Sequence, residues 1–292
     1  MRLIPHTAVA RGIAAVAVAA ALVGGVSACS GEDSTTTPRP TTAASATNRP
    51  DAYERPTAGA VAKLPEARYD AVVPGLLASR ATTLPDGMDT VAVLSADAPL
   101  YGADRTEPVA RFAAKDFLGE DTVVVPVRED GPWTLVLTPA RRSLPSRDPA
   151  APAQTAAWIR GDLLHTIQHI TDHVVIHVRQ QTVSIVGPSG AVDRTFSGGV
   201  GTDDTPTPAG VGYLQARYLD PAQGQSTYPI ELTSLHSAAA DEPFGGSDGG
   251  LIGIHYQPQH AGAVSHGCVR LDGPSIQVLN QLPLGTPVVI TP

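Results

Sequence analysis

Glycine and proline constrain this chain most, because 28 Gly and 27 Pro among 292 residues are nearly one residue in five. Proline interrupts helices and central strands, and glycine weakens both, so short strands joined by turns are favoured over long helices. Hydrophobic residues make up 42% of the chain, which is enough for packed cores, but aromatic residues make up only 4%. We therefore expect a mainly β protein whose cores consist of Ala, Val, Leu and Ile.

Charge and cysteine content exclude several classes of protein. The chain has 20 Lys and Arg against 28 Asp and Glu, a net charge of −8. An acidic chain without a basic run lacks the positive patch that nucleic acid requires, so we expect no nucleic-acid partner. With only two cysteines, Cys29 and Cys268, the chain is neither a disulfide-stapled mini-protein nor a Cys-only zinc protein.

Residues 1–28 have the features of a secretory signal. Arg2 and Arg11 precede an uncharged apolar run that ends at Ala28 and is shorter than a bilayer span. The run closes with the letters VSAC, which resemble the lipobox of bacterial lipoproteins. That resemblance implies export and lipidation of Cys29, with the acyl chains holding the protein on the outer face of the cytoplasmic membrane. Ordinary cleavage near Ala28, which leaves Cys29 free, is the alternative.

The next segment, residues 29–65, is rich in Thr, Ser, Ala and Pro and shows no hydrophobic period. Such a composition predicts a disordered, fairly stiff tether between membrane and folded domains. We expect two folded domains after it, at residues 66–165 and 166–292.

The first of these domains has short apolar runs interrupted by Pro, Gly and Asp. The runs Val123–Val127 and Trp133–Leu137 flank a turn that contains Asp-Gly, which predicts a hairpin. The spacing of Pro126, Trp133 and Trp158 loosely resembles bacterial SH3-type domains. The resemblance implies a small SH3-like β-barrel that either binds cell-wall peptide or serves as a spacer or packing partner.

Four histidines recur every fourth residue, at His165, His169, His173 and His177. On a helix they would form one face and a possible metal site. The β-branched sequence HVVIHV favours strands, which spread these side chains apart. We therefore predict no metal site here.

The second domain has the stronger strand pattern. One helix is predicted from Pro274, with Ile276, Leu279 and Leu282 on a single face. Strands are predicted at 174–178, 182–186, 191–196, 251–255, 268–271 and 288–290. This pattern predicts a β-sandwich or β-rich α+β domain with one clear helix.

Cys268 lies in the sequence SHGCVR and is the only thiol left if Cys29 is lipidated. A thiol attacks as the thiolate, so a catalytic cysteine needs a nearby base. His255 ends a predicted strand thirteen residues upstream, and the polar loop between the two is long enough to turn back. The consecutive N–H groups of Gly267 and Cys268 are expected to form an oxyanion hole. The alternative is that Cys268 only fills space in a core.

SHGCVR with the upstream histidine resembles the signature of the L,D-transpeptidase (YkuD-type) catalytic domain, and TPTPAG at 205–210 is similar to that family's TPxG turn. The resemblance implies that Cys268 is the nucleophile and that His255 is the general base, oriented by the backbone carbonyl of Tyr256. It further implies that His266 and Ser265 shape the pocket and that Arg270 binds a substrate carboxylate. The chain departs from the family at Tyr256, where Gly or Ser is usual, and in a somewhat shorter following loop.

The implied reaction is a two-step acyl transfer on peptidoglycan stem peptides. The cysteine takes an acyl group from a tetrapeptide stem and passes it to an acceptor amine, giving a 3→3 cross-link without a cofactor. The resemblance also implies that a carbapenem acylates Cys268. Two alternatives remain open: an L,D-carboxypeptidase in which water resolves the thioester, and a non-catalytic, lipid-anchored wall-binding module.

Three further patterns are weaker. The segment Tyr213–Gly250, with hinge-like glycines, is expected to be either a lid that excludes water or an irregular loop over a small core. The G-x-S-x-G match at 245–249 lies in a Gly-rich loop and is interpreted as coincidence. Zinc binding by His255, His260, His266 and Cys268 is disfavoured because no carboxylate or second cysteine pair accompanies them.

Overall fold

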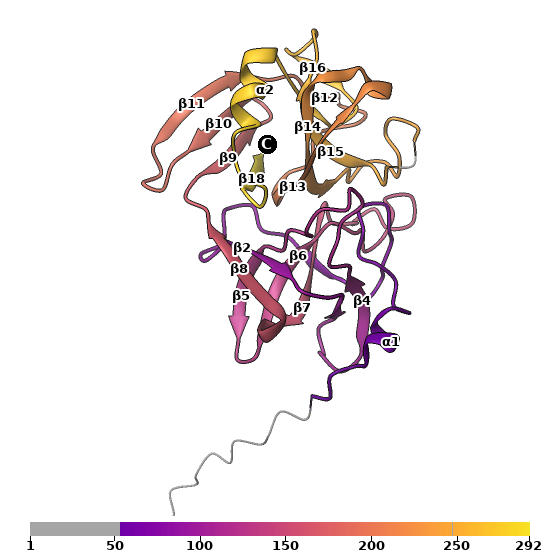
Figure 1. The fold of residues 1–292 in the computed structure, drawn as a ribbon. Helices are drawn as coiled ribbons and strands as arrows, with labels where there is room; N and C mark the ends of the chain where they lie inside the picture. The colour runs from indigo at the N-terminus through magenta and orange to yellow at the C-terminus, as the bar shows by residue number, and fades with distance from the viewer. Residues whose placement is uncertain (1–52, 247) are drawn as a thin grey trace, which may run out of the picture. The chain divides into compact units, whose positions relative to one another are not determined.

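The computed structural model describes residues 53–246 and 248–292, which are mainly β, as predicted (Figure 1). The predicted signal at 1–28 and the lipidation site Cys29 lie outside the described residues. The helices are α1 (Ala58–Val61), α2 (Gly273–Leu279) and two short 3-10 helices, η1 (Gly161–Leu163) and η2 (Pro221–Gln223). None of the helices within the described ranges is long and apolar enough to cross a membrane.

The N-terminal domain contains an antiparallel six-stranded sheet in the order β4-β3-β7-β6-β5, with β1 also paired to β7. Its strands are β1 (Leu77–Ser79), β3 (Ala98–Tyr101), β4 (Pro108–Phe112), β5 (Pro126–Asp130), β6 (Trp133–Thr138) and β7 (Gln154–Arg160). The predicted hairpin is confirmed as β5 and β6, and Gly131 takes the turn position with φ 59°. Its small aliphatic core includes Leu100, Val136 and Ile159. An SH3-like identity for this domain stays a prediction.

The folded part begins earlier than the prediction of a tether to residue 65 allowed. Thr57 caps α1 by accepting the Ala60 N–H, and Val61 is buried. The Tyr53 ring packs edge-on against the rings of Tyr101 and Trp133, with centroids 6.0 and 5.4 Å apart. The composition of residues 29–65 is dominated by Thr and Pro, so it does not reveal these few apolar side chains. They are sufficient to attach the end of this segment to the sheet.

The N-terminal domain also ends later than the boundary predicted after residue 165. That boundary falls inside β8 (Leu164–His169), which pairs with β2 (Thr90–Leu94). The following residue, Ile170, is buried and donates its N–H to the Asp89 carbonyl at 2.7 Å. The strand prediction for the four histidines is confirmed, since they occupy β8 and β9 (His173–His177).

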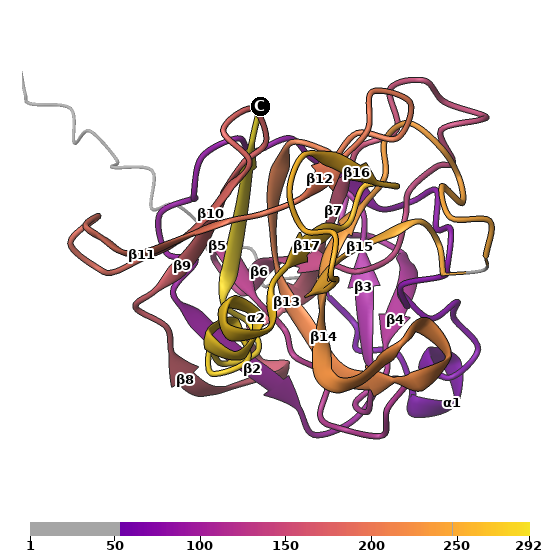
Figure 2. The ribbon, with the colours of Figure 1, turned by 90° about the horizontal axis from the view of Figure 1, so that it is seen from above.

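The C-terminal domain is built on an eight-stranded mixed sheet in the order β11-β10-β9-β18-β13-β14-β15-β17 (Figures 1 and 2). Its other strands are β10 (Thr182–Val186), β11 (Val192–Ser197), β13 (Gly210–Asp220), β14 (Gln225–His236), β15 (Leu251–Tyr256), β17 (Val269–Leu271) and β18 (Pro287–Thr291). A short parallel pair, β12 (Val200–Gly201) and β16 (Ala263–Ser265), lies outside it. The six predicted strands are present, with bounds that match or shift by one residue.

The predicted helix is confirmed as α2. The Asp272 carboxylate caps it by accepting the Ser275 N–H at 2.8 Å, and Pro274 lies in its first turn, where a missing N–H is harmless. Ile276 and Leu279 are fully buried in the core of the C-terminal domain, so one face of α2 covers the sheet.

The prediction of a lid or irregular loop at Tyr213–Gly250 is wrong for most of its length. Residues 213–220 belong to β13 and 225–236 to β14, two adjacent antiparallel strands in the interior of the sheet. Tyr213 is only 1% exposed. Strands buried on both faces lack the polar alternation that marks a strand in sequence, which is why the pattern missed them. Of the described residues in this stretch beyond the η2 turn, those at 237–246 and 248–250 form the loop between β14 and β15.

Candidate active site

The nucleophile and base predicted from the sequence lie on two neighbouring parallel strands. β15 pairs with β17 so that His255 is opposite Arg270 and Ile254 is opposite Val269. Cys268 immediately precedes β17 and is therefore level with Gly253, whose N–H is directed at the Cys268 Sγ at 3.4 Å. The polar loop from Tyr256 returns the chain to this position, as its length and composition predicted.

One cavity of about 300 Å³ collects most of the predicted site. Its lining includes five predicted residues: His255, Ser265, His266, Cys268 and Arg270. The Tyr256 side chain instead packs against the Tyr228 ring, with centroids 5.1 Å apart. A bulky residue is therefore accommodated beside the base without entering the cavity.

The His255 ring is held by backbone. Its Nδ1 lies 3.0 Å from the Tyr256 carbonyl, which can only accept, so Nδ1 carries the proton and Nε2 is the basic atom. The same carbonyl accepts the Gln225 side-chain amide at 2.9 Å. Burial lowers the pKa of His255, with the positive charge of Arg270 adding to the effect. The imidazole is therefore neutral and ready to take a proton. Sequence reasoning missed Gln225, which lies thirty residues away.

The Cys268 thiol is also neutral at rest. Burial raises the pKa of Cys268, and this outweighs the lowering by the Gly253 N–H and Arg270. The thiol donates toward the Leu251 carbonyl at 3.8 Å while it accepts the Gly253 N–H. In this arrangement the thiol proton faces backbone, so reaction requires the thiol to turn toward the imidazole.

The predicted oxyanion donors are only partly present. The Gly267 N–H donates to Ser265 Oγ at 3.1 Å, and the Ser265 hydroxyl in turn donates to the Cys268 carbonyl at 2.5 Å. The Gly267 N–H is thus used inside its own loop and does not face the cavity in this arrangement. Gly267 has φ 118°, and a Cβ there would lie 3.1 Å from the Ile252 side chain. Glycine is therefore required at 267 for loop shape.

Gly253 is the glycine that the sequence analysis overlooked. Its N–H is the backbone donor directed at the sulfur, and a Cβ on it would lie 3.3 Å from Ile230 and 3.9 Å from the Cys268 Sγ. A glycine inside a strand pattern signals close approach of another group. That signal was available in the sequence LIGIH.

The turn at residues 205–210 is hydrogen-bonded to the backbone next to Cys268. The buried Thr207 hydroxyl accepts the Gly201 N–H at 2.9 Å and donates to the Gly267 carbonyl at 2.7 Å. A Cβ at Gly201 would lie 2.2 Å from the Thr205 carbonyl. Strand β12 and the turn therefore fix the backbone next to Cys268 through one hydroxyl.

Arg270 has a buried polar atom without a protein partner. Its Nε makes no hydrogen bond within the described part of the chain, although the side chain lines the cavity. A guanidinium that lines a cavity is suited to an anionic ligand, since Arg binds carboxylates through paired N–H donors.

The opposite wall of the cavity comes from the 237–250 loop. Pro243, Phe244, Asp248 and Gly250 line it, and the Phe244 ring lies 5.5 Å from the His266 ring. We call this segment the loop wall, and β15 with β17 and the Ser265–Cys268 turn the strand wall.

A second cavity of about 470 Å³ shares His255 and Cys268 with the first. It extends to Tyr69, Phe117 and Leu118, which belong to the N-terminal domain. The site is therefore continuous with a surface contributed by both domains, which nothing in the local sequence pattern indicated.

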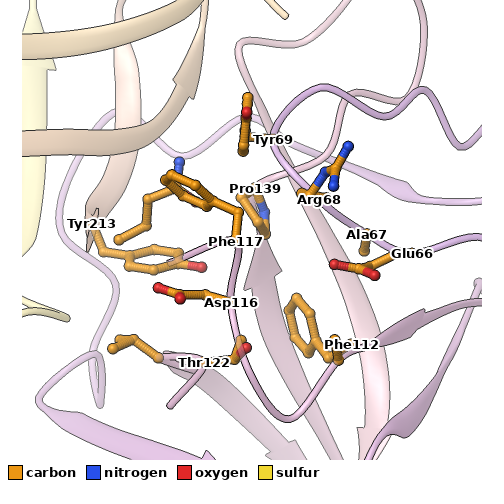
Figure 3. A pocket seen from close by; sticks show the side chains of 13 residues that line it. Glu66, Ala67, Arg68, Tyr69, Phe112, Asp116, Phe117, Thr122, Pro139 and Tyr213 are labelled. Atoms are coloured by element: carbon orange, nitrogen blue, oxygen red, sulfur yellow. The ribbon is translucent and has the colours of Figure 1, made fainter. Parts of the chain in front are cut away.

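A third cavity, of about 40 Å³, lies beside Tyr69 and Phe117 (Figure 3). It is lined by Phe112 and Tyr213 as well, and its volume suits a few water molecules but not a peptide. It has no part in the site.

The other sequence patterns lie elsewhere. His260 is not in the lining of the cavity that holds His255, and its Nδ1 contacts the Gln257 and Pro258 carbonyls. No group of three or more His, Cys, Asp or Glu within 53–246 and 248–292 is placed to hold a metal ion. The G-x-S-x-G match lies in the loop between β14 and β15, without the strand-turn-helix that this motif needs, and its Ser247 lies outside the described residues.

Comparison with known proteins gives a family for the C-terminal domain. The model of the L,D-transpeptidase catalytic domain, YkuD, matches residues 171–290. A search of curated proteins finds no match.

Several solved structures align with the chain at low identity. An L,D-transpeptidase from Mycobacterium smegmatis is 16% identical over 58% of this chain and 90% of its own, with a TM-score of 0.36. L,D-transpeptidase 1 from Mycobacterium tuberculosis is 16% identical over 47% and 77%, with a TM-score of 0.32. L,D-transpeptidase 3 from M. tuberculosis, solved with a faropenem-derived adduct, is 15% identical over 59% and 91%, with a TM-score of 0.35. Similarities this weak add nothing to the assignment, which rests on the family model. The catalytic-domain model thus matches the same part of the chain that carries the motif resemblance, residues 171–290.

Proposed function

We propose that this protein is a peptidoglycan L,D-transpeptidase that forms 3→3 cross-links by cysteine acyl transfer. The observation that carries the proposal is that His255, Cys268 and Arg270 line one cavity from two paired parallel strands. The cavity thus holds a nucleophile, a base and a cation for a carboxylate. A peptide with a free carboxylate near the scissile bond matches this set.

In the first half-reaction the Cys268 Sγ attacks the carbonyl carbon between the third residue of a tetrapeptide stem and its terminal D-Ala. The thiol proton passes to His255 Nε2, and the carbonyl π electrons move to oxygen. The tetrahedral intermediate then collapses, the C–N bond breaks, and the imidazolium protonates the leaving D-Ala amine. The products are free D-Ala and a thioester between the tripeptide and Cys268.

In the second half-reaction the side-chain amine of another stem attacks the thioester carbonyl. Its surplus proton passes to His255 Nε2, the C–S bond breaks, and the proton is returned to the Cys268 sulfur. A new amide bond joins the third residues of the two stems. If water attacks in place of the amine, the product is a free tripeptide and the protein is an L,D-carboxypeptidase.

The pKa shifts favour proton transfer over a resting ion pair. Burial raises the pKa of the Cys268 thiol and lowers the pKa of His255, so both groups are neutral before substrate binds. Attack then requires the thiol to rotate from the Leu251 carbonyl to His255 Nε2. The Gly253 N–H, already directed at the sulfur, stabilises the developing thiolate.

Arg270 and the serine of the motif have supporting roles in this scheme. The Arg270 side chain lines the cavity, and its guanidinium would donate a charge-assisted hydrogen bond to a substrate carboxylate. Ser265 fixes the Cys268 carbonyl, and His266 forms the side of the cavity against Phe244.

We also propose that the protein is exported and lipid-anchored through Cys29, on the evidence of the VSAC sequence after an apolar run. Release of the full-length protein from membranes by the substitution Cys29→Ala is the expected result. Retention of the variant in the membrane fraction would contradict the anchor.

Intact mass spectrometry after exposure to a disaccharide-tetrapeptide tests the enzymatic proposal. The expected result is a mass gain equal to the donor less D-Ala, absent in Cys268→Ala and reversed when acceptor stem is added. A cross-linked dimer supports transpeptidation, whereas a released tripeptide without dimer identifies the carboxypeptidase. A folded protein that gains no mass from the peptide or from a carbapenem would refute cysteine catalysis and leave the wall-binding module.

A further inference from the structure

Arg141 belongs to the N-terminal domain, but its side chain serves the loop wall. Its backbone is fixed on both sides, because its N–H donates to the Ala71 carbonyl at 2.9 Å and its carbonyl accepts the Val73 N–H at 2.8 Å. The residue is only 2% exposed and is the largest fully buried side chain in the described part of the protein. The guanidinium therefore starts from a rigid position.

The guanidinium donates only to backbone carbonyls of the 237–250 segment. Nε donates to Gly249 at 2.6 Å and Nη1 to Ser237 at 3.0 Å. Nη2 donates to Ala240 at 3.3 Å and to Asp241 at 3.1 Å. The planar guanidinium, whose donors have fixed relative positions, thus connects the start of the loop to its end.

A buried arginine normally faces a carboxylate, because an unpaired buried charge is strongly destabilising. Here the hydrogen bonds are to dipoles, and burial lowers the pKa of Arg141 while nearby Asp241 and Glu242 oppose that effect. Burial of Arg141 without a carboxylate partner is therefore unfavourable for the stability of the fold. Its hydrogen bonds do, however, define the path of a loop backbone that has no strand or helix of its own.

The backbone of the loop is shaped to this contact. A Cβ at Gly250 would lie 2.3 Å from Arg141 Nη2, and a Cβ at Gly249 would lie 2.5 Å from the Tyr69 carbonyl. His236, at the end of β14, donates its Nε2–H to the same Tyr69 carbonyl at 2.9 Å. Two residues of the N-terminal domain therefore donate hydrogen bonds to the loop: Arg141 and Ser146, whose N–H and hydroxyl donate to the Asp241 carboxylate at 2.9 and 2.6 Å. Tyr69 holds the end of β14, directly before the loop.

The anchored carbonyls bracket the residues that face the site. Pro243, Phe244 and Asp248 lie between Asp241 and Gly249 and line the cavity that holds Cys268. Leu251, which accepts the thiol hydrogen bond, follows Gly250 directly. A displacement of the loop would therefore alter one wall of the substrate cavity and the resting contact of the nucleophile, while His255 and Arg270 stayed in their strands.

We propose that Arg141 is a positioning residue for the reaction: from the N-terminal domain it sets the loop wall against which a stem peptide binds. The inference rests on the proposed function for its catalytic readout. It assigns the N-terminal domain a role in building the cavity, independent of any wall binding.

The test compares Arg141→Met with Arg142→Met in the full chain. Arg142 is the exposed neighbour, so its variant is a matched control for loss of one arginine. We expect Arg141→Met to accelerate amide exchange in 237–250 at least about tenfold and to lower kcat/KM for acylation by the disaccharide-tetrapeptide by about ten- to a hundredfold. Iodoacetamide is a small reagent that does not bind against the loop wall. The rate at which it alkylates Cys268 should therefore be unchanged or faster. Arg142→Met should match wild type in all three measurements.

The outcomes separate the two proposals. Unchanged exchange and acylation in Arg141→Met would overturn the positioning role, as would equal losses of peptide acylation and alkylation that follow a lowered melting temperature. If Arg141→Met fails to fold, Arg141→Lys replaces it, since lysine keeps the charge but not the planar set of donors. The same changes in amide exchange and in kcat/KM are then expected, but smaller. If wild type forms no thioester with the peptide, the proposed function fails, and the exchange measurement alone then decides whether Arg141 orders the loop.

Discussion

The two walls of the Cys268 cavity are held in different ways. The strand wall is fixed by the ladder between β15 and β17, whose residues lie within twenty-one positions of one another. The loop wall is fixed by Arg141, which is 108 residues from its partner Gly249. In the proposed reaction the strand wall supplies the reacting groups, and the loop wall supplies a surface for the substrate.

This difference separates the chemical step of the proposed reaction from the recognition of its substrate. Proton transfer and attack need a nucleophile and a base in register, which a pair of strands supplies with little freedom. Recognition of a long peptide needs a shaped surface, and that surface depends here on a second domain. Substitutions in the strand wall should therefore act on any reagent that needs the base, whereas substitutions in the loop wall should act mainly on large substrates.

The largest effect is expected in the strand wall, for His255→Gln. Loss of the titratable Nε2 should slow thioester formation by about 10²- to 10⁴-fold, because the amide cannot take the thiol proton. The rate of mass gain with tetrapeptide measures it. His260→Gln is the control, since its Nδ1 contacts the Gln257 and Pro258 carbonyls, and it should retain the wild-type rate. A fast His255→Gln would mean that another group is the base.

The next effect is expected in the loop wall, for Gly250→Ala. Gly250 has φ 63°, and its new Cβ would meet Arg141 Nη2 and the Asp241 carbonyl at 2.3 and 2.6 Å. We expect a loss of about 1–3 kcal/mol in unfolding free energy from strain and a lower rate of peptide acylation. Gly87→Ala, with φ 82° and open space around it, controls for the backbone conformation alone. Equal losses in the two variants would show that the loop tolerates the contact.

A smaller effect should appear as pH dependence of stability at the end of β14, directly before the loop wall. Burial, with the charge of Arg141 nearby, lowers the pKa of His236 from 6.5 to about 3. The unfolded chain binds a proton below pH 6.5 that the folded chain excludes, so stability is complete above that pH and falls as the pH drops toward 3. The expected slope is about 1.4 kcal/mol per pH unit from this group.

Urea unfolding between pH 7 and 4.5 measures this slope, and His236→Gln should flatten it relative to wild type. Parallel slopes for the two proteins would show that His236 does not carry the dependence.

The smallest effect is expected for Phe244→Ala, at the exposed edge of the loop wall. Its contact with the His266 ring is an edge-on ring pair of about 0.5–1.5 kcal/mol, so KM for the peptide should rise by up to about tenfold with kcat unchanged. Steady-state kinetics with tetrapeptide donor check this. A fall in kcat without a change in KM would instead place Phe244 in the chemical step.

The features that sequence predicted are the ones encoded locally. The β5–β6 hairpin follows from an Asp-Gly turn between two apolar runs, and α2 from Asp272 and Pro274 before a periodic apolar face. The placement of His255 and Cys268 on neighbouring strands around one cavity follows from two short strands and the length of one loop. For each of these features, the residues that determine it lie within about twenty positions of one another in the sequence.

The features that sequence missed depend on distant contacts. The prediction of a lid or an irregular loop at β13 and β14 is wrong because strands buried on both faces lose their alternation, and their burial is set by neighbours elsewhere in the chain. Nothing around Arg141 signals that its partners are carbonyls some hundred residues later. The motif also did not reveal that the Gly267 N–H, one of the two predicted oxyanion donors, donates to the Ser265 hydroxyl.

The passage from β8 to β9 has a mechanical consequence. Only three residues, 170–172, separate the two strands, and the first of them is buried with its N–H bonded to Asp89. Such a short, hydrogen-bonded connection limits how far the two domains can separate. Under the proposed function, both domains must therefore reach a cell-wall substrate together.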